Sequence, residues 1–145
     1  MIPDGAKAIV ILDDEPERIV AMRSEFAKAS SQLDLVTFDN APDTIAWLHD
    51  HLENMALICL DHDLGPNQRR GESVFDPGTG RDVADFLATH TPVCPVLIHT
   101  TNSMAAPGMQ LVLEDAGWAV ARVTPYEHLT WIGVDWIEAV CKLLD

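Results

Sequence analysis

Three aspartates directly follow apolar segments of strand length, and these residues are the best suited in the sequence to bind a metal ion. Asp13 and Asp14 come after the apolar run 8–12, and Asp61 comes after the run 56–60. Crowded carboxylates repel one another, so they must take up protons or share a cation. A hard divalent ion with oxygen ligands meets that need, and we expect Mg²⁺, with Mn²⁺ or Ca²⁺ as alternatives.

Two histidines near these acids are candidates for proton transfer. His62 lies between Asp61 and Asp63, where its ring could act as a general acid, or it could be a surface residue without a partner. His99 ends the apolar run 95–98 and could be an acid, a base, a ligand or a buried structural histidine. Asp63 is either a fourth metal ligand or a cap of its own loop.

Four further residues are candidates for binding phosphate. Thr100 and Asn102 follow His99 and could hydrogen-bond phosphate oxygens. Arg69 and Arg70 lie in segment 64–79, whose glycines and prolines predict a long loop. An arginine pair that faces the acids could clamp a phosphate, although such pairs are also often solvated.

The elements that must position these residues alternate between apolar runs and amphipathic segments. Strands are predicted at 8–12, 35–38, 56–60, 95–98 and 118–123, the last possibly at an edge. One helix is predicted near 15–29, and a second begins after an Asn40 cap. A third begins near 79–80, a fourth ends at Gly117, and the last spans about 131–144. The alternation predicts an α/β fold with a doubly wound, five-stranded parallel sheet in three layers. In the strand order 2-1-3-4-5, the first and third strands are neighbours and their acids meet.

Composition limits the class of protein. The 145 residues fit one domain over 1–145, and 48% of them are hydrophobic. The net charge of −14 disfavours long nucleic acid and anionic membranes and favours cations. Cys59, Cys94 and Cys141 are predicted to be buried or half-buried thiols in a reducing compartment. No signal peptide or membrane-spanning run is visible, which predicts a cytoplasmic protein.

The order of these motifs resembles that of response-regulator receiver domains. Residues 11–15 are similar to the acidic pair of receivers, Asp61 to their phosphoacceptor, and residues 95–100 to the strand that ends in a phosphate-binding hydroxyl. The resemblance implies a flavodoxin-like, CheY-like fold in the order 2-1-3-4-5, with Mg²⁺ held by Asp13, Asp14 and Asp61. Thr124 stands where receivers have a lysine that pairs with the phosphoryl group.

Two motifs resemble a divergent branch, the cyclic-phosphate-processing receiver domains. That branch carries the motifs Asp-His-Asp-Leu-Gly and His-x-x-Asn, which match residues 61–65 and 99–102 of this sequence. The resemblance implies metal-dependent handling of a phosphate ester.

Three functions therefore stay open. The chain could be an enzyme that processes a cyclic phosphate or another small phosphate ester, with Asp61, His62 and His99 in catalytic roles. It could be a signalling receiver that a phosphodonor protein phosphorylates on Asp61. It could also be a catalytically silent pseudo-receiver that binds a partner protein. Trp131 and Trp136 could then serve the interface, although their helical spacing favours the core.

Overall fold

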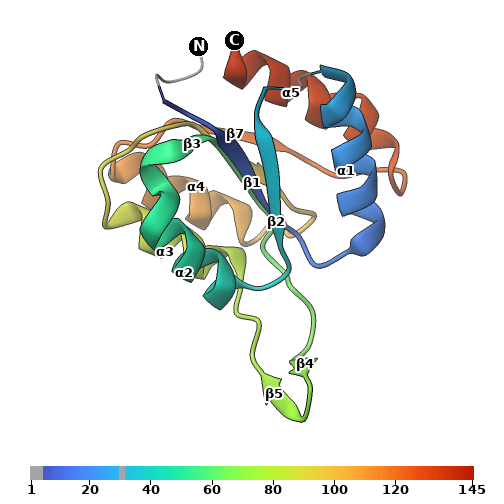
Figure 1. Cartoon of the computed structure of the whole chain (residues 1–145), viewed down its shortest axis with the longest axis vertical. Helices are drawn as coiled ribbons and strands as arrows, with labels where there is room; N and C mark the ends of the chain where they lie inside the picture. The colour runs from blue at the N-terminus through green and yellow to red at the C-terminus, as the bar shows by residue number, and fades with distance from the viewer. Residues whose placement is uncertain (1–4, 30–31) are drawn as a thin grey trace.

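A five-stranded parallel sheet lies between two layers of helices in the computed structural model, which describes residues 5–29 and 32–145 (Figure 1). The strands of this sheet are β1 (Ala8–Leu12), β2 (Asp34–Phe38), β3 (Met55–Leu60), β6 (Val96–His99) and β7 (Val120–Val123). The helices are α1 (Pro16–Ala29), α2 (Ala41–His51), α3 (Gly80–Ala88), α4 (Ala106–Asp115) and α5 (Asp135–Leu144). Two short 3₁₀ helices, η1 (Leu52–Asn54) and η2 (Thr130–Gly133), complete these layers.

The strand order is β2-β1-β3-β6-β7, which is the predicted order 2-1-3-4-5 when the strands of this sheet are counted along the chain. Each neighbouring pair is parallel, and β7 lies at an edge, as predicted. Leu12 is paired with Leu60 at the ends of β1 and β3. The residues that follow these two strands therefore emerge side by side.

Alternation along the central strands divides the core in two. Val10 and Leu12 pack against α2, α3 and α4, whereas Ile9 and Ile11 pack against α1, η2 and α5. Every residue of β1 and β3 is buried, as expected for strands covered on both faces. The predicted last helix is divided into η2 and α5, and its Trp131 and Trp136 are both buried in the core.

Two helix starts match the sequence signals. The Asn40 side chain caps α2 by accepting a hydrogen bond from the Asp43 backbone N–H at 2.8 Å. Thr79 and Asp82 form a capping box at the start of α3, at the predicted position.

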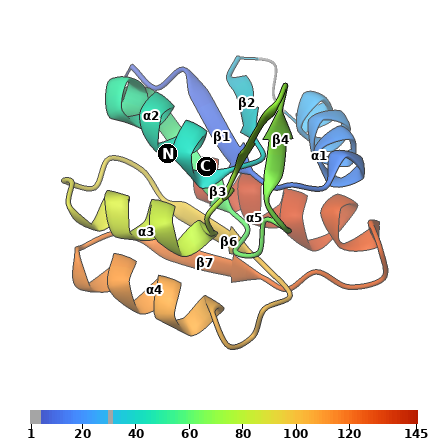
Figure 2. The ribbon, with the colours of Figure 1, turned by 90° about the horizontal axis from the view of Figure 1, so that it is seen from below.

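The prediction that residues 64–79 form a loop is wrong in part, because this segment, here called the hairpin arm, contains an antiparallel hairpin. Strands β4 (Gln68–Arg70) and β5 (Ser73–Phe75) pair across a tight turn, with Gly71 at a φ of 63°. A positive φ of this kind suits the short turns that match strand twist. The arm projects from the sheet edge at which β1 and β3 end (Figures 1 and 2).

The predicted burial of the thiols is confirmed for Cys59 and Cys94, which are buried, and is wrong for Cys141, which is exposed on α5. Cys141 lies on the solvent side of an amphipathic helix whose buried face carries Trp136 and Val140. Among the residues that the structure describes, no helix has the length and apolar character needed to cross a membrane.

Candidate functional site

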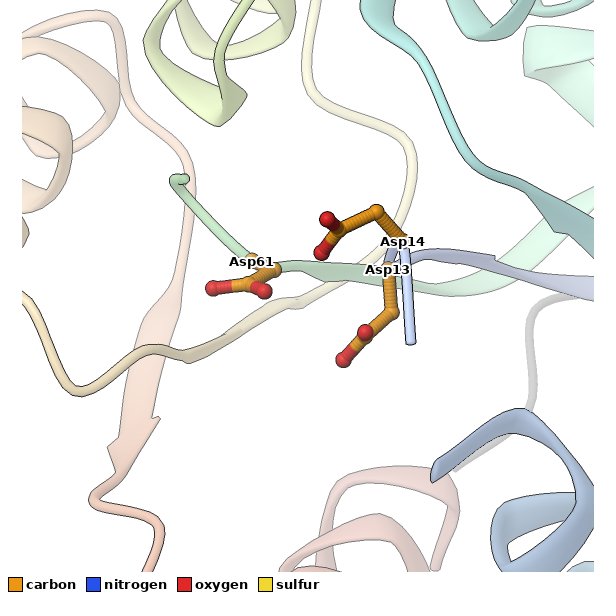
Figure 3. A group of neighbouring side chains, drawn as sticks. All are labelled: Asp13, Asp14 and Asp61. Atoms are coloured by element: carbon orange, nitrogen blue, oxygen red, sulfur yellow. The ribbon is translucent and has the colours of Figure 1, made fainter. Parts of the chain in front are cut away.

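The structure brings together three of the predicted acids. Asp13, Asp14 and Asp61 each offer a carboxylate oxygen, and these oxygens all lie within 4.8 Å of one another (Figure 3). The cause is the register of the sheet, since Asp13 and Asp61 each come one residue after the paired Leu12 and Leu60.

Strand alternation explains which way the site residues face. Ile11, Cys59 and Leu97 pack in the core on the α1 and α5 side. The residues two positions further on, Asp13, Asp61 and His99, therefore project to that same side. The hairpin arm instead approaches Asp14. A Cβ at Gly65, which has a φ of 76°, would lie 2.9 Å from Asp14 Oδ2. Glycine at position 65 thus allows the arm to come close to the acids.

Asp13 is held as a buried carboxylate. Its Oδ1 accepts a hydrogen bond from the Glu15 backbone N–H at 2.8 Å, and its Oδ2 lies 3.0 Å from His99 Nε2. Burial acts to raise the pKa of Asp13, but the hydrogen bond and the charge of His99, with smaller contributions from the Glu15 backbone and Arg18, together lower it. Asp13 therefore stays ionised.

The pKa values of Asp61 and Asp14 are shifted in the opposite direction, upward. Burial, opposed by the charge of His99 and reinforced by repulsion from Asp13, raises the pKa of Asp61 to about 6. Burial and the charge of Asp13 also raise the pKa of Asp14. Ionised carboxylates at Asp14 and Asp61 are therefore disfavoured mainly by burial.

Arg18 is a site residue that the sequence analysis missed. Its Nη1 lies 3.5 Å from Asp13 Oδ2 and 3.5 Å from Asp61 Oδ2. Its guanidinium carbon lies 5.4 Å from the centre of the Trp131 ring. The signal was present in the helical spacing, because Arg18 is four residues before the buried Met22, on the core-facing side of α1.

Asp63 is not part of the acidic group, and with His62 and Asn102 it forms a separate polar cluster. His62 Nδ1 lies 2.8 Å from Asp63 Oδ1, and Asn102 Nδ2 lies 3.2 Å from Asp63 Oδ2. The side-chain Oδ1 of Asn102 accepts hydrogen bonds from the backbone N–H groups of Met104 and Ala105, at 3.1 and 2.9 Å. Asn102 therefore links the turn before α4 to the His62–Asp63 pair.

His99 and Thr100 are more deeply buried than this polar cluster. His99 is fully buried, and its ring stacks on Trp131 with centroids 5.9 Å apart. Within the described part of the chain, its Nδ1 has no hydrogen-bond partner. Thr100 is also buried, and its Oγ accepts a hydrogen bond from the Asn102 backbone N–H at 3.1 Å.

The two arginines of the arm are separated in role. Arg70 Nη2 lies 2.6 Å from Asp43 Oδ2, and its guanidinium lies over the Phe75 ring at 5.1 Å. Arg70 therefore anchors the arm to α2, and the phosphate clamp by Arg69 and Arg70 stays a prediction. Arg69 lines a hollow that Asp14 also lines.

The residues present fit a hard divalent ion. The three converging groups offer carboxylate oxygens, which are the ligands that Mg²⁺, Mn²⁺ and Ca²⁺ prefer. Burial first, and then the charge of Asp13, raise the pKa values of Asp14 and Asp61, and a bound cation would oppose both effects. This donor set does not select one of the three ions.

Solved structures with the same fold are receiver domains. The phosphorylated cyanobacterial phytochrome response regulator RcpA matches with a TM-score of 0.68 and 16% identity, over 93% of this chain and 91% of that one. The Mn²⁺-bound response regulator Rcp1 matches with a TM-score of 0.64 and 16% identity, over 94% and 90%. A receiver domain from Rhodospirillum rubrum matches with 0.64 and 17%, over 92% and 90%.

Fold and strand order thus define a CheY-like receiver domain with an acidic cluster at the carboxyl edge of its sheet. Residues 8–115 match the model of the cyclic-phosphate processing receiver domain. The chain belongs to that family, as its two motifs had indicated. No curated protein sequence matches it.

Proposed function

We propose that this chain is a metal-dependent enzyme that processes cyclic phosphate esters, with Mg²⁺, Mn²⁺ or Ca²⁺ held by Asp13, Asp14 and Asp61. The observation that carries the proposal is the convergence of three carboxylates within 4.8 Å in a member of the cyclic-phosphate processing family. The Mn²⁺-bound form of Rcp1, which shares the fold, supports a divalent ion. When bound, such an ion polarises a phosphoryl oxygen and lowers the pKa of a coordinated water.

The proposed reaction is the hydrolytic opening of a cyclic ester. The oxygen of a water adds to phosphorus, one ring P–O bond breaks, and one proton of that water is transferred to the leaving alkoxide, which gives a monoester with a free hydroxyl. We assign this proton transfer to His62, whose Nδ1 is paired with Asp63 Oδ1 at 2.8 Å. The pairing orients the ring and leaves Nε2 to exchange a proton.

The other candidates have supporting roles in this proposal. His99, buried behind Asp13 at 3.0 Å, is a positioning residue that holds this carboxylate in place. Asn102 holds Asp63 in contact with His62. Thr100 Oγ accepts a hydrogen bond from the Asn102 backbone, so its hydroxyl hydrogen can be donated to a phosphate oxygen.

Opening of a 2′,3′-cyclic nucleotide in the presence of Mg²⁺, followed by ³¹P NMR, tests the proposal. We expect turnover that EDTA abolishes and that His62→Ala lowers about 100-fold, within the usual range for general acid–base catalysis. His49→Ala is the matched control, because His49 is exposed on α2 and pairs with Asp50. Absence of turnover in a protein that binds Mg²⁺ would contradict the proposal.

A second candidate function is phosphorylation of Asp61 by a phosphodonor protein. It is favoured by the position of Asp61 at the end of β3, with Oδ2 3.5 Å from the Arg18 guanidinium, which could pair with an added phosphoryl group. The phosphorylated RcpA shares the fold. Incubation with acetyl phosphate and Mg²⁺ would then add a stable phosphoryl mass that Asp61→Asn removes. If neither turnover nor phosphorylation occurs, the partner-binding pseudo-receiver is favoured.

A further inference from the structure

Two hollows beside the candidate metal site share two lining residues, and together they are here called the groove. The first, of about 470 Å³, lies between α1 and the end of β2 and includes Asp13 and Asp14 in its lining. The second, of about 360 Å³, lies against the hairpin arm. Asp14 and Asp39 line both, so the groove passes directly beside the acidic cluster.

The two ends of the groove differ in chemistry. The hollow at α1 is lined by the apolar side chains of Ile19, Val20 and Phe38, and also by four aspartates. Val20 is 68% exposed, so it contributes little to the core. The end at the arm is lined by Asn67, Gln68 and Arg69. A ligand that fills the groove therefore has an apolar part and a polar part.

The charges of the lining residues indicate where the anionic part of that ligand would bind. Arg69 is the one cationic residue among the described residues that line the two hollows. Arg70 is already paired with Asp43 at 2.6 Å. A phosphate beside Asp14 can therefore reach a metal ion on one side and Arg69 on the other.

The apolar end is better suited to a planar base than to an alkyl chain. Phe38 and the branched side chains of Ile19 and Val20 offer flat and aliphatic contacts, and Asp39 stands beside them as a hydrogen-bond acceptor. Asp39 Oδ1 already accepts a hydrogen bond from Asn40 Nδ2 at 2.8 Å, and a base with an exocyclic amine offers this carboxylate a further donor, which an alkyl chain does not. The hollow of about 470 Å³ is also within the usual size range of ligand sites.

We propose that this groove binds the nucleoside part of a nucleoside cyclic phosphate. The base lies against Ile19, Val20 and Phe38, and the phosphate lies between Asp14 and Arg69. The inference rests on the proposed function and names the substrate class for that same site.

The test compares two esters that contain the same cyclic phosphate ring. Protein with labelled isoleucine and valine methyl groups is titrated, with Mg²⁺ present, with 2′,3′-cyclic AMP and with ethylene phosphate, the same cyclic diester without a nucleoside. We expect the methyl resonances of Ile19 and Val20 to shift with the nucleotide only. Val20→Asn should weaken binding of the nucleotide about tenfold and leave ethylene phosphate unaffected. Leu111→Asn, at an exposed leucine of α4 outside the groove, should change neither.

The outcomes separate this inference from the proposed reaction. Shifted Ile19 and Val20 methyl groups without turnover of either ester would support the groove and contradict the reaction. Equal turnover of both esters, with these methyl groups unshifted, would support the reaction and overturn the groove. Equal affinity of the two esters, or an unchanged nucleotide affinity in Val20→Asn, would also overturn it.

Discussion

The acidic cluster and the hairpin arm border the same groove, but they are built in opposite ways. Asp13 and Asp61 are 1% and 5% exposed, and the register of two central strands fixes them. Leu64 at the base of the arm is buried in the core, and beyond it the arm is attached through more exposed side chains, including Gln68 to the Asp39 carbonyl at 2.7 Å and Arg70 to Asp43. The proposed metal chemistry therefore rests on carboxylates that the sheet holds in place, whereas the arm adds an exposed residue, Arg69, to the border of the groove.

The largest effect should come from breaking the cluster itself. Asp61→Asn removes a ligand charge, so we expect affinity for Mg²⁺ or Mn²⁺ to fall more than about 100-fold, beyond the usual effect of losing a supporting residue. Isothermal titration calorimetry measures it. Asp85→Asn, at an exposed residue paired with Arg81 on α3, is the control. Near-normal affinity in Asp61→Asn would show that the cluster is not the metal site.

The next effect concerns the pH dependence of stability without metal. The folded-state pKa of Asp61, about 6, is above the ordinary 3.8, so the folded protein binds this proton more tightly. The stability that protonation provides is complete below about pH 4 and lost as pH rises through 6. The shift corresponds to an upper limit of about 3 kcal/mol.

Urea unfolding in EDTA at pH 4.5 and pH 8 measures this term. The side chain in Asp61→Asn does not titrate, so the variant should not show this loss of stability. Its free energy of unfolding relative to that of the wild type should therefore rise from pH 4.5 to pH 8. Asp13 has the opposite sign, because its pKa is lowered and its contribution is lost only as pH falls below the ordinary range. A parallel pH dependence of wild type and variant would contradict the raised pKa of Asp61.

Arg18 should oppose a metal ion within the cluster. Its guanidinium lies 3.5 Å from oxygens of both Asp13 and Asp61. Arg18→Gln removes this competing charge, so we expect affinity for Mg²⁺ to rise about tenfold, a fraction of the unscreened Coulomb energy at such distances. Arg23→Gln is the matched control on the same helix, because Arg23 contacts Leu35 and Thr37 instead. Weaker binding in Arg18→Gln would mean that Arg18 mainly orients the acids.

Much of the cluster could be predicted because its cause is local. The buried runs 8–12 and 56–60 require a sheet covered on both faces, and acids directly after them must emerge at one edge. The same alternation could have paired His99 with Asp13, and the spacing of Arg18 and Met22 could have placed Arg18 at the site. These contacts were missed because side-chain direction was not followed past the strand ends.

The arm could not be predicted in this way. Segments 68–70 and 73–75 lack apolar alternation, so nothing local marks them as strands. Their position depends on contacts made 29 and 27 residues away along the chain, from Gln68 to Asp39 and from Arg70 to Asp43. The neighbouring residues Arg69 and Arg70 therefore give the same prediction of a phosphate clamp whether both are free or one already forms an ion pair with Asp43.

The smallest effects should distinguish Arg69 from Arg70. Arg70→Gln loses the ion pair with Asp43, so amides of the arm should exchange hydrogen faster while affinity for Mg²⁺ is unchanged. Arg69→Gln should leave this exchange unchanged and weaken binding of a cyclic nucleotide by at most about fivefold, because exposed charge pairs contribute little. Hydrogen exchange with mass spectrometry and a nucleotide titration on both variants measure the two effects. If Arg69→Gln loosens the arm and Arg70→Gln weakens the nucleotide, the arm has these roles reversed. In that case the ion pair with Asp43 must open when a ligand binds.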